Sequence, residues 1–494
     1  MDLFSAHFFI LTLALVGVMI IVAALLSGLI DRSDVPQVGV FLALGAILGP
    51  AGLQLLDVSL DSPILRVVAT LSLVLVLFTD AVSLSIAEVR RHRLLAALVL
   101  GPGTLLSAVL IALAAWRLLD LSPASAAMIG AALASTDPVM LRGLLRRPGL
   151  PEPVRLALRL ESGLNDAVLL PIVLVGMAIL SRNHLGGIDS ARLGLDLFLL
   201  GPGAGVAVGL LAVGALELVR RRIGVRRDYE SLYSLGVAFT AYAAAESVHG
   251  SGFLAAFSAG LTIAALDVEL CDCFHEYGQT TAEMTLLFTF ILFGSSLIWQ
   301  GLSALNPATL IFAVAAILVR PIVFFLSLAP ANLDRKSRLL IAWFGPRGLG
   351  SLLLILVPVF AGVPGTEQLF VVCCLVVLLS VALHGGSLML LGRKACPAVP
   401  VNVNLNAAAI AVLKDGEAIE PALDNEGDRI SVEELHRLQR TGAPVLVVDA
   451  RSEASFGSSA HQAQGALRIP PDQAVRRLKE LDVPRAAWIA VFCA

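Results

Sequence analysis

Two short stretches of the sequence bring carboxylates together with a helix-breaking residue or with other polar groups. They read Thr136-Asp137-Pro138 and Glu161-Ser162-Gly163-Leu164-Asn165-Asp166. In the second stretch Glu161 and Asn165 are four residues apart, as are Ser162 and Asp166, so on a helix the four polar groups share one broad face. Carboxylate, hydroxyl and carbonyl oxygens are the ligands that hard cations prefer. The two stretches therefore indicate reversible binding of a cation or a proton.

The composition indicates that a lipid bilayer surrounds these residues. Of the 494 residues, 57% are hydrophobic and 15% are charged, and the mean hydropathy is +0.87. A typical soluble domain is about half apolar and about a quarter charged. Apolar runs of about twenty residues, long enough to cross a bilayer as a helix, recur as far as Arg393. These runs exclude a soluble protein, and the net charge of −3 argues against a nucleic-acid partner.

Thirteen hydrophobic segments predict an all-α polytopic membrane protein. They span 8–30, 35–53, 63–84, 95–117, 123–142, 153–181, 193–221, 230–247, 251–266, 283–300, 306–329, 336–360 and 367–392. No basic residues precede the first run, so we expect a retained helix and not a cleaved signal peptide.

The distribution of Lys and Arg predicts the orientation. Connections after odd-numbered segments and their flanks hold eighteen of these residues, and connections after even-numbered segments hold four. Because cytoplasmic loops are enriched in basic residues, we expect an external N-terminus and a cytoplasmic C-terminus in the cell (inner) membrane.

Proline interrupts the fifth and twelfth segments, at Thr136-Asp137-Pro138 and at Phe344-Gly345-Pro346-Arg347-Gly348. Proline removes a backbone donor and clashes with the preceding turn, so each helix should open within the membrane. If segments 1–6 and 8–13 are inverted repeats, both breaks fall in the fifth helix of a repeat, as in many transporters. The alternative is two unrelated proline kinks.

The charged residues of these segments form a nearly balanced set. A charge in the bilayer core costs several kcal/mol, so such residues are functional candidates. Asp166 lies about a dozen residues inside the sixth segment, roughly 20 Å along a helix. If one cavity holds Asp137, Glu161, Asp166, Arg347 and Arg320, the charges leave an excess of one negative. One Na⁺ or one proton would neutralise it, which is the requirement for an obligate exchanger.

These residues predict a division of roles within the site. We expect Na⁺ to bind Asp166, the Ser162 hydroxyl, the Thr136 carbonyl and Asp137, the last directly or through water. Arg347 cannot lose its proton, so we expect a structural ion pair between Arg347 and Glu161. Asp166 then remains as the exchangeable carboxylate.

The sequence from about residue 8 to 394 resembles the monovalent cation/proton antiporters of the NhaP/NHE-like branch. The matching motifs are Leu77-Phe78-Thr79-Asp80, Thr136-Asp137-Pro138, Glu161 to Asp166, Ser251-Gly252-Phe253-Leu254-Ala255 and Gly345-Pro346-Arg347-Gly348. The resemblance implies a homodimer of about thirteen helices per chain, built from two inverted six-helix repeats with crossed broken helices. It also implies a core domain that moves against a dimerisation domain, without ATP or another cofactor.

The resemblance further implies residue roles. The family's sodium ligands and their helper correspond to Thr136 (through its carbonyl), Ser162, Asp166 and Asp137, and the family's ion pair corresponds to Glu161 and Arg347. Relatives with Asn-Asp at the positions of Asn165 and Asp166 tend to exchange one cation for one proton, so we expect electroneutral exchange.

Several alternatives remain open at this point. The resemblance covers potassium-preferring members, and no residue decides between Na⁺, Li⁺ and K⁺. A cation channel would also need carboxylates in the membrane, although not matched broken helices. Arg320, Asp80 and His249 are secondary candidates, since the last two lie near segment ends where hydrated structural roles are common.

The composition changes after Lys394. We assign 1–394 to the transmembrane antiporter domain, 395–428 to a linker and 429–494 to a cytoplasmic domain. Ser431 to Glu434 forms a capping box, and strands are predicted at 445–448 and 488–492. This tail resembles the first part of a rhodanese-like domain, through Asp449-Ala450-Arg451-Ser452, Gly465-Ala466 to Pro470, and Cys493. Because only Ala494 follows Cys493, the expectation is an incomplete domain without sulfurtransferase activity.

Overall fold

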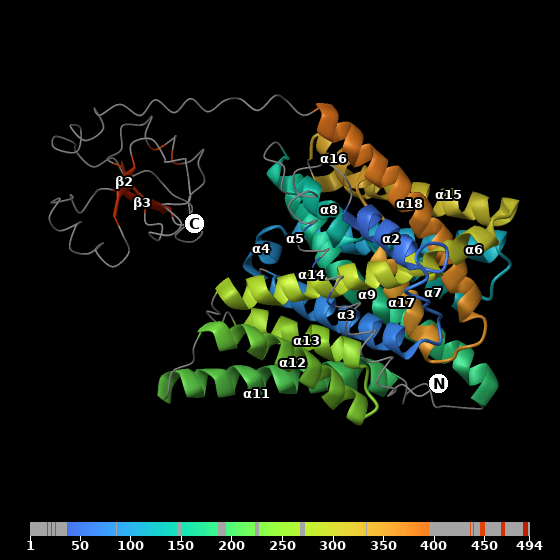
Figure 1. Cartoon of the computed structure of the whole chain (residues 1–494), viewed down its shortest axis with the longest axis horizontal. Coiled ribbons are helices and arrows are strands. Elements are labelled where there is room, and N and C mark those ends of the chain that lie inside the picture. The colour runs from blue at the N-terminus through green and yellow to red at the C-terminus, as the bar shows by residue number, and fades with distance from the viewer. Residues whose placement is uncertain are drawn as a thin grey trace. The chain divides into compact units, whose positions relative to one another are not determined.

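The computed structural model describes two units of the chain, Met1–Ala395 and Cys396–Ala494 (Figure 1). Described residues are 17, 21, 25, 37–84, 86–145, 150–185, 194–222, 227–266, 272–331, 333–394, 435, 438, 445–449, 466–469 and 488–492. The first unit is a helical bundle. The second unit contains a small sheet.

The helices of the first unit overlap the predicted segments, although several segments are divided or differ in their bounds. They are α2 (Gln37–Leu48), α3 (Pro63–Val82), α4 (Ile86–Arg91), α5 (Arg93–Leu98), a π-helix (Val99–Leu105), α6 (Leu106–Leu118), α7 (Pro123–Ala134), α8 (Pro138–Leu145), α9 (Glu152–Leu185), a second π-helix (Asp196–Leu200), α11 (Gly201–Arg222), α12 (Arg227–Ser247), α13 (Gly252–Ala265), α14 (Asp272–Ser295), a 3₁₀-helix (Leu297–Ala304), α15 (Pro307–Ser327), a short 3₁₀ turn (Ala329–Ala331), α16 (Arg335–Trp343), α17 (Leu349–Phe360) and α18 (Thr366–Lys394).

Polar residues followed by proline start several of these helices. Ser122 precedes Pro123, and its hydroxyl accepts a hydrogen bond from the amide of Ser125 at 3.1 Å. Asn306 precedes Pro307 in the same way and accepts the amide of Thr309 at 2.9 Å. The first helical turn has no intrahelical acceptor for its N–H groups, so the polar side chain supplies one and the proline removes another donor.

The number of full spans differs from the prediction. In the described ranges, seven helices are long and apolar enough to cross a membrane, or eight if α14 and the following 3₁₀-helix, bent by 50°, form one span. The prediction of thirteen spans is therefore wrong by this measure. Segments 35–53 and 251–266 form the short helices α2 and α13, and segment 336–360 is divided between α16 and α17. The predicted segment 8–30 lies almost wholly outside the described residues.

Both predicted breaks are confirmed. The first separates α7, which ends at Ala134, from α8, which begins at Pro138. The second separates α16, which ends at Trp343, from α17, which begins at Leu349. Backbone groups at a break lose their helical partners and must find others, since lipid offers none.

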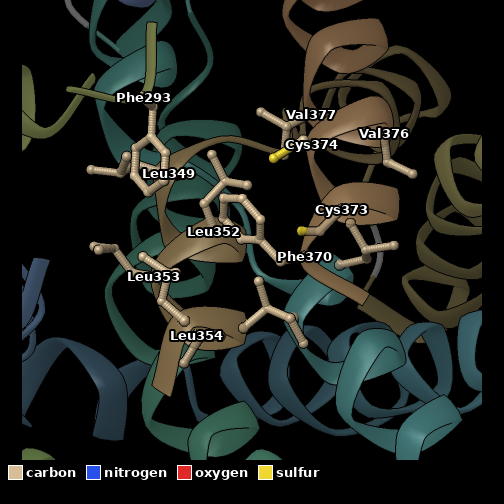
Figure 2. Close-up of a cluster of buried hydrophobic side chains, with 14 of the residues drawn as sticks. Phe293, Leu349, Leu352, Leu353, Leu354, Phe370, Cys373, Cys374, Val376 and Val377 are labelled. Atoms are coloured by element: carbon tan, nitrogen blue, oxygen red, sulfur yellow. The ribbon is translucent and has the colours of Figure 1, made fainter. Parts of the chain in front are cut away.

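Buried apolar side chains hold α17 against α18. Figure 2 shows Leu349 and Leu352 of α17 near Phe370 and Cys373 of α18, with Phe293 of α14 beside them. All five are at most 1% exposed. In a membrane, helix association depends on such close packing, and here it holds the C-terminal half of the second broken helix in place.

A second group of helices, α11, α12 and α13, lies side by side in Figure 1, and α13 also packs against α3. The backbones of neighbouring helices approach each other very closely where one of them has a glycine. A Cβ added to Gly205 of α11 would lie 2.1 Å from the Ala255 carbonyl oxygen. A Cβ on Gly260 of α13 would lie 2.6 Å from the Phe78 carbonyl oxygen and 2.9 Å from the Ala81 methyl. We call this contact, formed by Phe78, Ala81 and Gly260, the α3–α13 seam.

The second unit contains three parallel strands, β1 (Val445–Asp449), β2 (Leu467–Arg468) and β3 (Trp488–Phe492), in the order β2-β1-β3. Val448 pairs with Leu467, and Val445 pairs with Trp488. The strands predicted at 445–448 and 488–492 are confirmed. The predicted linker, the capping box at 431–434 and Cys493 lie outside the described residues.

Candidate ion-binding site

The two breaks meet at Asp137. Its amide donates to the Pro346 carbonyl oxygen at 2.9 Å, which ties the first break to the second. Its Oδ1 accepts the Val139 amide at 2.8 Å, and its Oδ2 accepts the Leu349 amide at 2.9 Å. One buried carboxylate therefore caps the N-termini of both α8 and α17, where the helix dipole favours negative charge.

Two buried arginines donate hydrogen bonds at the C-terminal ends of the helices that precede the breaks. Arg347 Nη1 donates to the carbonyl oxygens of Ala134 and Ser135 at 2.7 and 3.1 Å, at the end of α7. Arg320 Nη1 donates to the carbonyl oxygens of Ile341 and Ala342 at 2.9 and 2.6 Å, near the end of α16. Each broken helix thus has its freed carbonyls covered by a cation, as the dipole at a helix C-terminus favours.

Glu161 pairs with Arg320 and not with Arg347, so the predicted Glu161–Arg347 ion pair is wrong. Arg320 Nε and Nη2 donate to Glu161 Oε1 and Oε2 at 2.9 and 2.5 Å, with each side chain 2% exposed. This bidentate geometry is typical of a guanidinium paired with a carboxylate. Gly345 leaves room for it, since a Cβ there would lie 1.9 Å from Arg320 Nε. Arg347 is engaged instead by the carbonyls of the first break.

Asp166 lies beside the first break. Its Oδ1 accepts the Ser135 hydroxyl at 2.5 Å, the one hydrogen bond that the described residues give this carboxylate. The neighbouring Asn165 donates through Nδ2 to the Thr136 hydroxyl at 2.8 Å. Asn165 Oδ1 and Arg347 Nη2 are buried without a hydrogen-bond partner among the described residues. The structure therefore brings together the predicted residues Asp166, Asn165, Thr136 and Asp137.

A cavity of about 390 Å³ adjoins this cluster. Its lining includes Pro138, directly after Asp137, and Ser162, one helical turn before Asp166. Asp80, Arg159 and Glu283 supply charged side chains to the same cavity. The cavity therefore places polar and charged side chains beside the first break.

The secondary candidates are distributed differently. Arg320 holds the second break, and Asp80 of α3 lines the cavity. His249 lies in the exposed turn between α12 and α13, with a positive φ of 61°. It is not among the residues that line the cavity.

Sequence reasoning missed three residues of the site. A Cβ added to Gly348 would lie 1.9 Å from Asp137 Oδ2, so glycine is needed for the shared cap. Ser135 is the residue that hydrogen-bonds Asp166, and Arg159 lies in the cavity wall. Two of these residues could be found from the sequence. Ser135 adjoins the predicted break, and Arg159 lies three residues before Ser162 and hence on the same face of the helix.

Comparison with known proteins agrees with this fold. A family model described as sodium/hydrogen exchanger, transmembrane, matches residues 16–394. The "K(+)/H(+) antiporter NhaP" of Alkalimonas amylolytica is 27% identical over 389 residues, which cover 78% of this chain and 66% of that protein. The "K(+)/H(+) antiporter NhaP2" of Shewanella sp. (strain MR-4) is 29% identical over 453 residues, covering 86% of this chain and 72% of that protein.

A solved structure shows the same architecture. The structure of the sodium proton antiporter MjNhaP1 from Methanocaldococcus jannaschii at pH 8 superposes with a TM-score of 0.61 and 20% identity, covering 76% of this chain and 99% of that chain. The two proteins share a fold. With the family match over residues 16–394, the chain belongs to the sodium/hydrogen exchanger family of transmembrane proteins.

Proposed function

We propose that this protein exchanges one monovalent cation for one proton, and that both ions bind at Asp166. The observation that carries the proposal is the charge distribution at the two breaks. Glu161 and Arg320 neutralise each other. At the first break, Asp137 and Asp166 together carry one negative charge more than Arg347 provides. One cation or one proton would neutralise the site, and leaving it without either would be costly in the membrane.

The geometry favours unequal roles for the two aspartates. Both oxygens of Asp137 accept backbone amides, which favours a helper that acts through water or through the field of its charge. Asp166 accepts one hydroxyl and so has free lone pairs for an ion. We propose that the ligands are the Asp166 carboxylate, the Ser162 hydroxyl and the Thr136 carbonyl.

The transported cation is proposed to be Na⁺, with K⁺ as the second candidate. The NhaP and NhaP2 relatives are named as K⁺/H⁺ antiporters, whereas MjNhaP1 is named as a sodium proton antiporter. Oxygen ligands accommodate either ion. A comparison of Na⁺, Li⁺ and K⁺ in one assay would identify the substrate.

The remaining proposals concern the whole protein. We propose a homodimer with an external N-terminus, the latter because eighteen Lys and Arg follow odd-numbered segments against four after even-numbered ones. We further propose that the inverted repeats place the two breaks opposite each other, and that transport serves pH and sodium homeostasis. For the tail, the parallel strands β1 to β3 are consistent with a rhodanese-like domain.

The decisive experiment uses everted membrane vesicles with an internal acid load reported by a pH-sensitive dye. Addition of Na⁺, Li⁺ or K⁺ should restore the dye fluorescence in a saturable way, and reversing the ion gradients should reverse the proton flux. Collapse of the membrane potential should leave the rate unchanged, because one charge moves each way. Flux that does not saturate, or cation flux without proton movement, would identify a channel instead.

A further inference from the structure

The cavity beside the first break contains a charge that the proposed exchange does not use. Among the described residues that line it, Arg159 is the one basic side chain, and it is exposed. Its guanidinium makes no ion pair or hydrogen bond within the described part of the chain. Asp80 of α3 and Glu283 of α14 face the same cavity and have partners of their own. Arg159 is therefore not held there as half of a salt bridge.

The position of Arg159 on α9 brings its charge close to the path of an ion. Arg159 lies three residues before Ser162, and both line the cavity, so they share one face of the helix. Two turns of α9 separate Arg159 from Asp166, which places the charge on the order of 10 Å from the carboxylate. At this separation a fixed positive charge repels any cation that approaches the break.

We propose that Arg159 sets the affinity of the site for both competing ions by the same factor, so that it tunes the working range of the exchanger without changing its ion preference. This inference rests on the proposed exchange at Asp166. A sodium ion and a proton each carry one positive charge, so the field of Arg159 weakens the binding of both alike. A ligand residue acts differently, because its oxygen distinguishes ions by size and coordination.

Equal weakening of two competitors has a specific kinetic signature. In competitive exchange, the apparent KM for the cation is its own dissociation constant multiplied by a term that grows with proton concentration. At alkaline pH few sites are protonated, so the apparent KM follows the cation affinity directly. At acidic pH the apparent KM depends on the ratio of the two affinities, which Arg159 leaves unchanged.

The test is the KM of Arg159→Gln in everted vesicles, measured across buffer pH with the cation that the wild type transports. At alkaline pH the KM should fall about three- to tenfold at low ionic strength. At acidic pH the KM should match the wild type. The pH midpoint of exchange should move in the alkaline direction by the logarithm of the same factor, and the order of preference among Na⁺, Li⁺ and K⁺ should stay the same.

Two further variants separate charge from structure. Arg159→Lys keeps the charge and should keep the wild-type KM and pH midpoint. Arg117→Gln removes an arginine from the last turn of α6, outside the cavity lining, and should also leave both values unchanged. The proposal fails if Arg159→Gln and Arg159→Lys alter the KM alike, if the KM falls equally at both pH values, or if it does not change. Absence of cation-dependent dequenching in the wild type would instead contradict the proposed antiport itself.

Discussion

The helix ends at the first and second breaks are stabilised in the same way, but the two breaks differ in net charge. An arginine covers the freed carbonyls of each: Arg347 those of α7, and Arg320 those near the end of α16. Asp137 caps the helix that follows each break. The second break is then complete, because Glu161 neutralises Arg320.

The first break is left with an excess of negative charge once Asp166 is counted beside Asp137 and Arg347. A fully paired buried site is rigid, whereas one with an uncompensated charge needs a mobile ion to balance it. The second break is therefore fully paired among the described residues, and the first break carries the excess charge that the proposed ion would balance.

The largest expected effect comes from removing the excess charge. Asp166→Asn should abolish cation-dependent dequenching in everted vesicles, because the site is then neutral without an ion. The variant should fold as well as the wild type, since Asn has nearly the same shape and the change removes a buried charge. Expression level and melting temperature in detergent provide the control, and exchange at the wild-type rate would assign the ion to another residue.

The next test asks which arginine balances Glu161. Glu161→Gln leaves Arg320 buried without its counter-ion and should cost about 3–5 kcal/mol of stability, measured as a lower melting temperature in detergent. The double variant Glu161→Gln/Arg320→Gln should recover part of this loss. The matched double variant Glu161→Gln/Arg347→Gln should recover none, because Arg347 contacts carbonyls and not Glu161. Recovery in the second double variant alone would reverse the assignment of the two breaks.

A smaller effect should follow from crowding the shared cap. Gly348→Ala places a methyl group 1.9 Å from Asp137 Oδ2, so either the carboxylate or the start of α17 must shift. Overpacking of this kind costs about 1–3 kcal/mol, and the exchange rate should fall because the cap and the binding residues share one break. Gly236→Ala is the control, since nothing lies within 4 Å of the position of its Cβ. Equal behaviour of the two variants would show that the cap tolerates displacement.

The smallest expected effect concerns the N-terminal caps of the two broken helices, at the ends remote from the breaks. Ser122 caps α7 with a neutral hydroxyl, and Asp334 caps α16 by accepting the amides of Lys336 and Ser337. Hydrogen bonds from the side chain and backbone of Ser337 lower the pKa of Asp334 below its ordinary value. A lowered pKa in the folded state means stabilisation above the unfolded pKa that is lost as the pH falls through the folded value.

The two caps should therefore respond differently to pH. Asp334→Ala should lower the melting temperature in detergent at neutral pH, and its difference from the wild type should shrink below about pH 4. Ser122→Ala should show a difference that does not change with pH. A constant difference for Asp334→Ala would indicate that the charge of the cap contributes nothing.

The sequence predicted the local features of this molecule better than its long-range pairs. Asp137-Pro138 and Pro346 marked both breaks because proline acts on its own helix. The partner of Glu161 could not be derived in this way. Arg320 and Arg347 are both buried cations far away in the chain, and only the path of α15 beside α16 decides between them.

The number of spans was mispredicted for a related reason. Hydrophobicity alone does not distinguish a full span from two half-helices such as α16 and α17, whose break is satisfied by side chains from other segments. Ser135 and Gly348 were missed because their roles depend on contacts with Asp166 and Asp137.

The shared cap at Asp137 also constrains how the molecule can move. Its carboxylate and amide join α8, α17 and the Pro346 carbonyl through three hydrogen bonds. Moving α8 and α17 apart would break all three hydrogen bonds and leave buried polar groups without partners, so the cap couples the positions of these two helices.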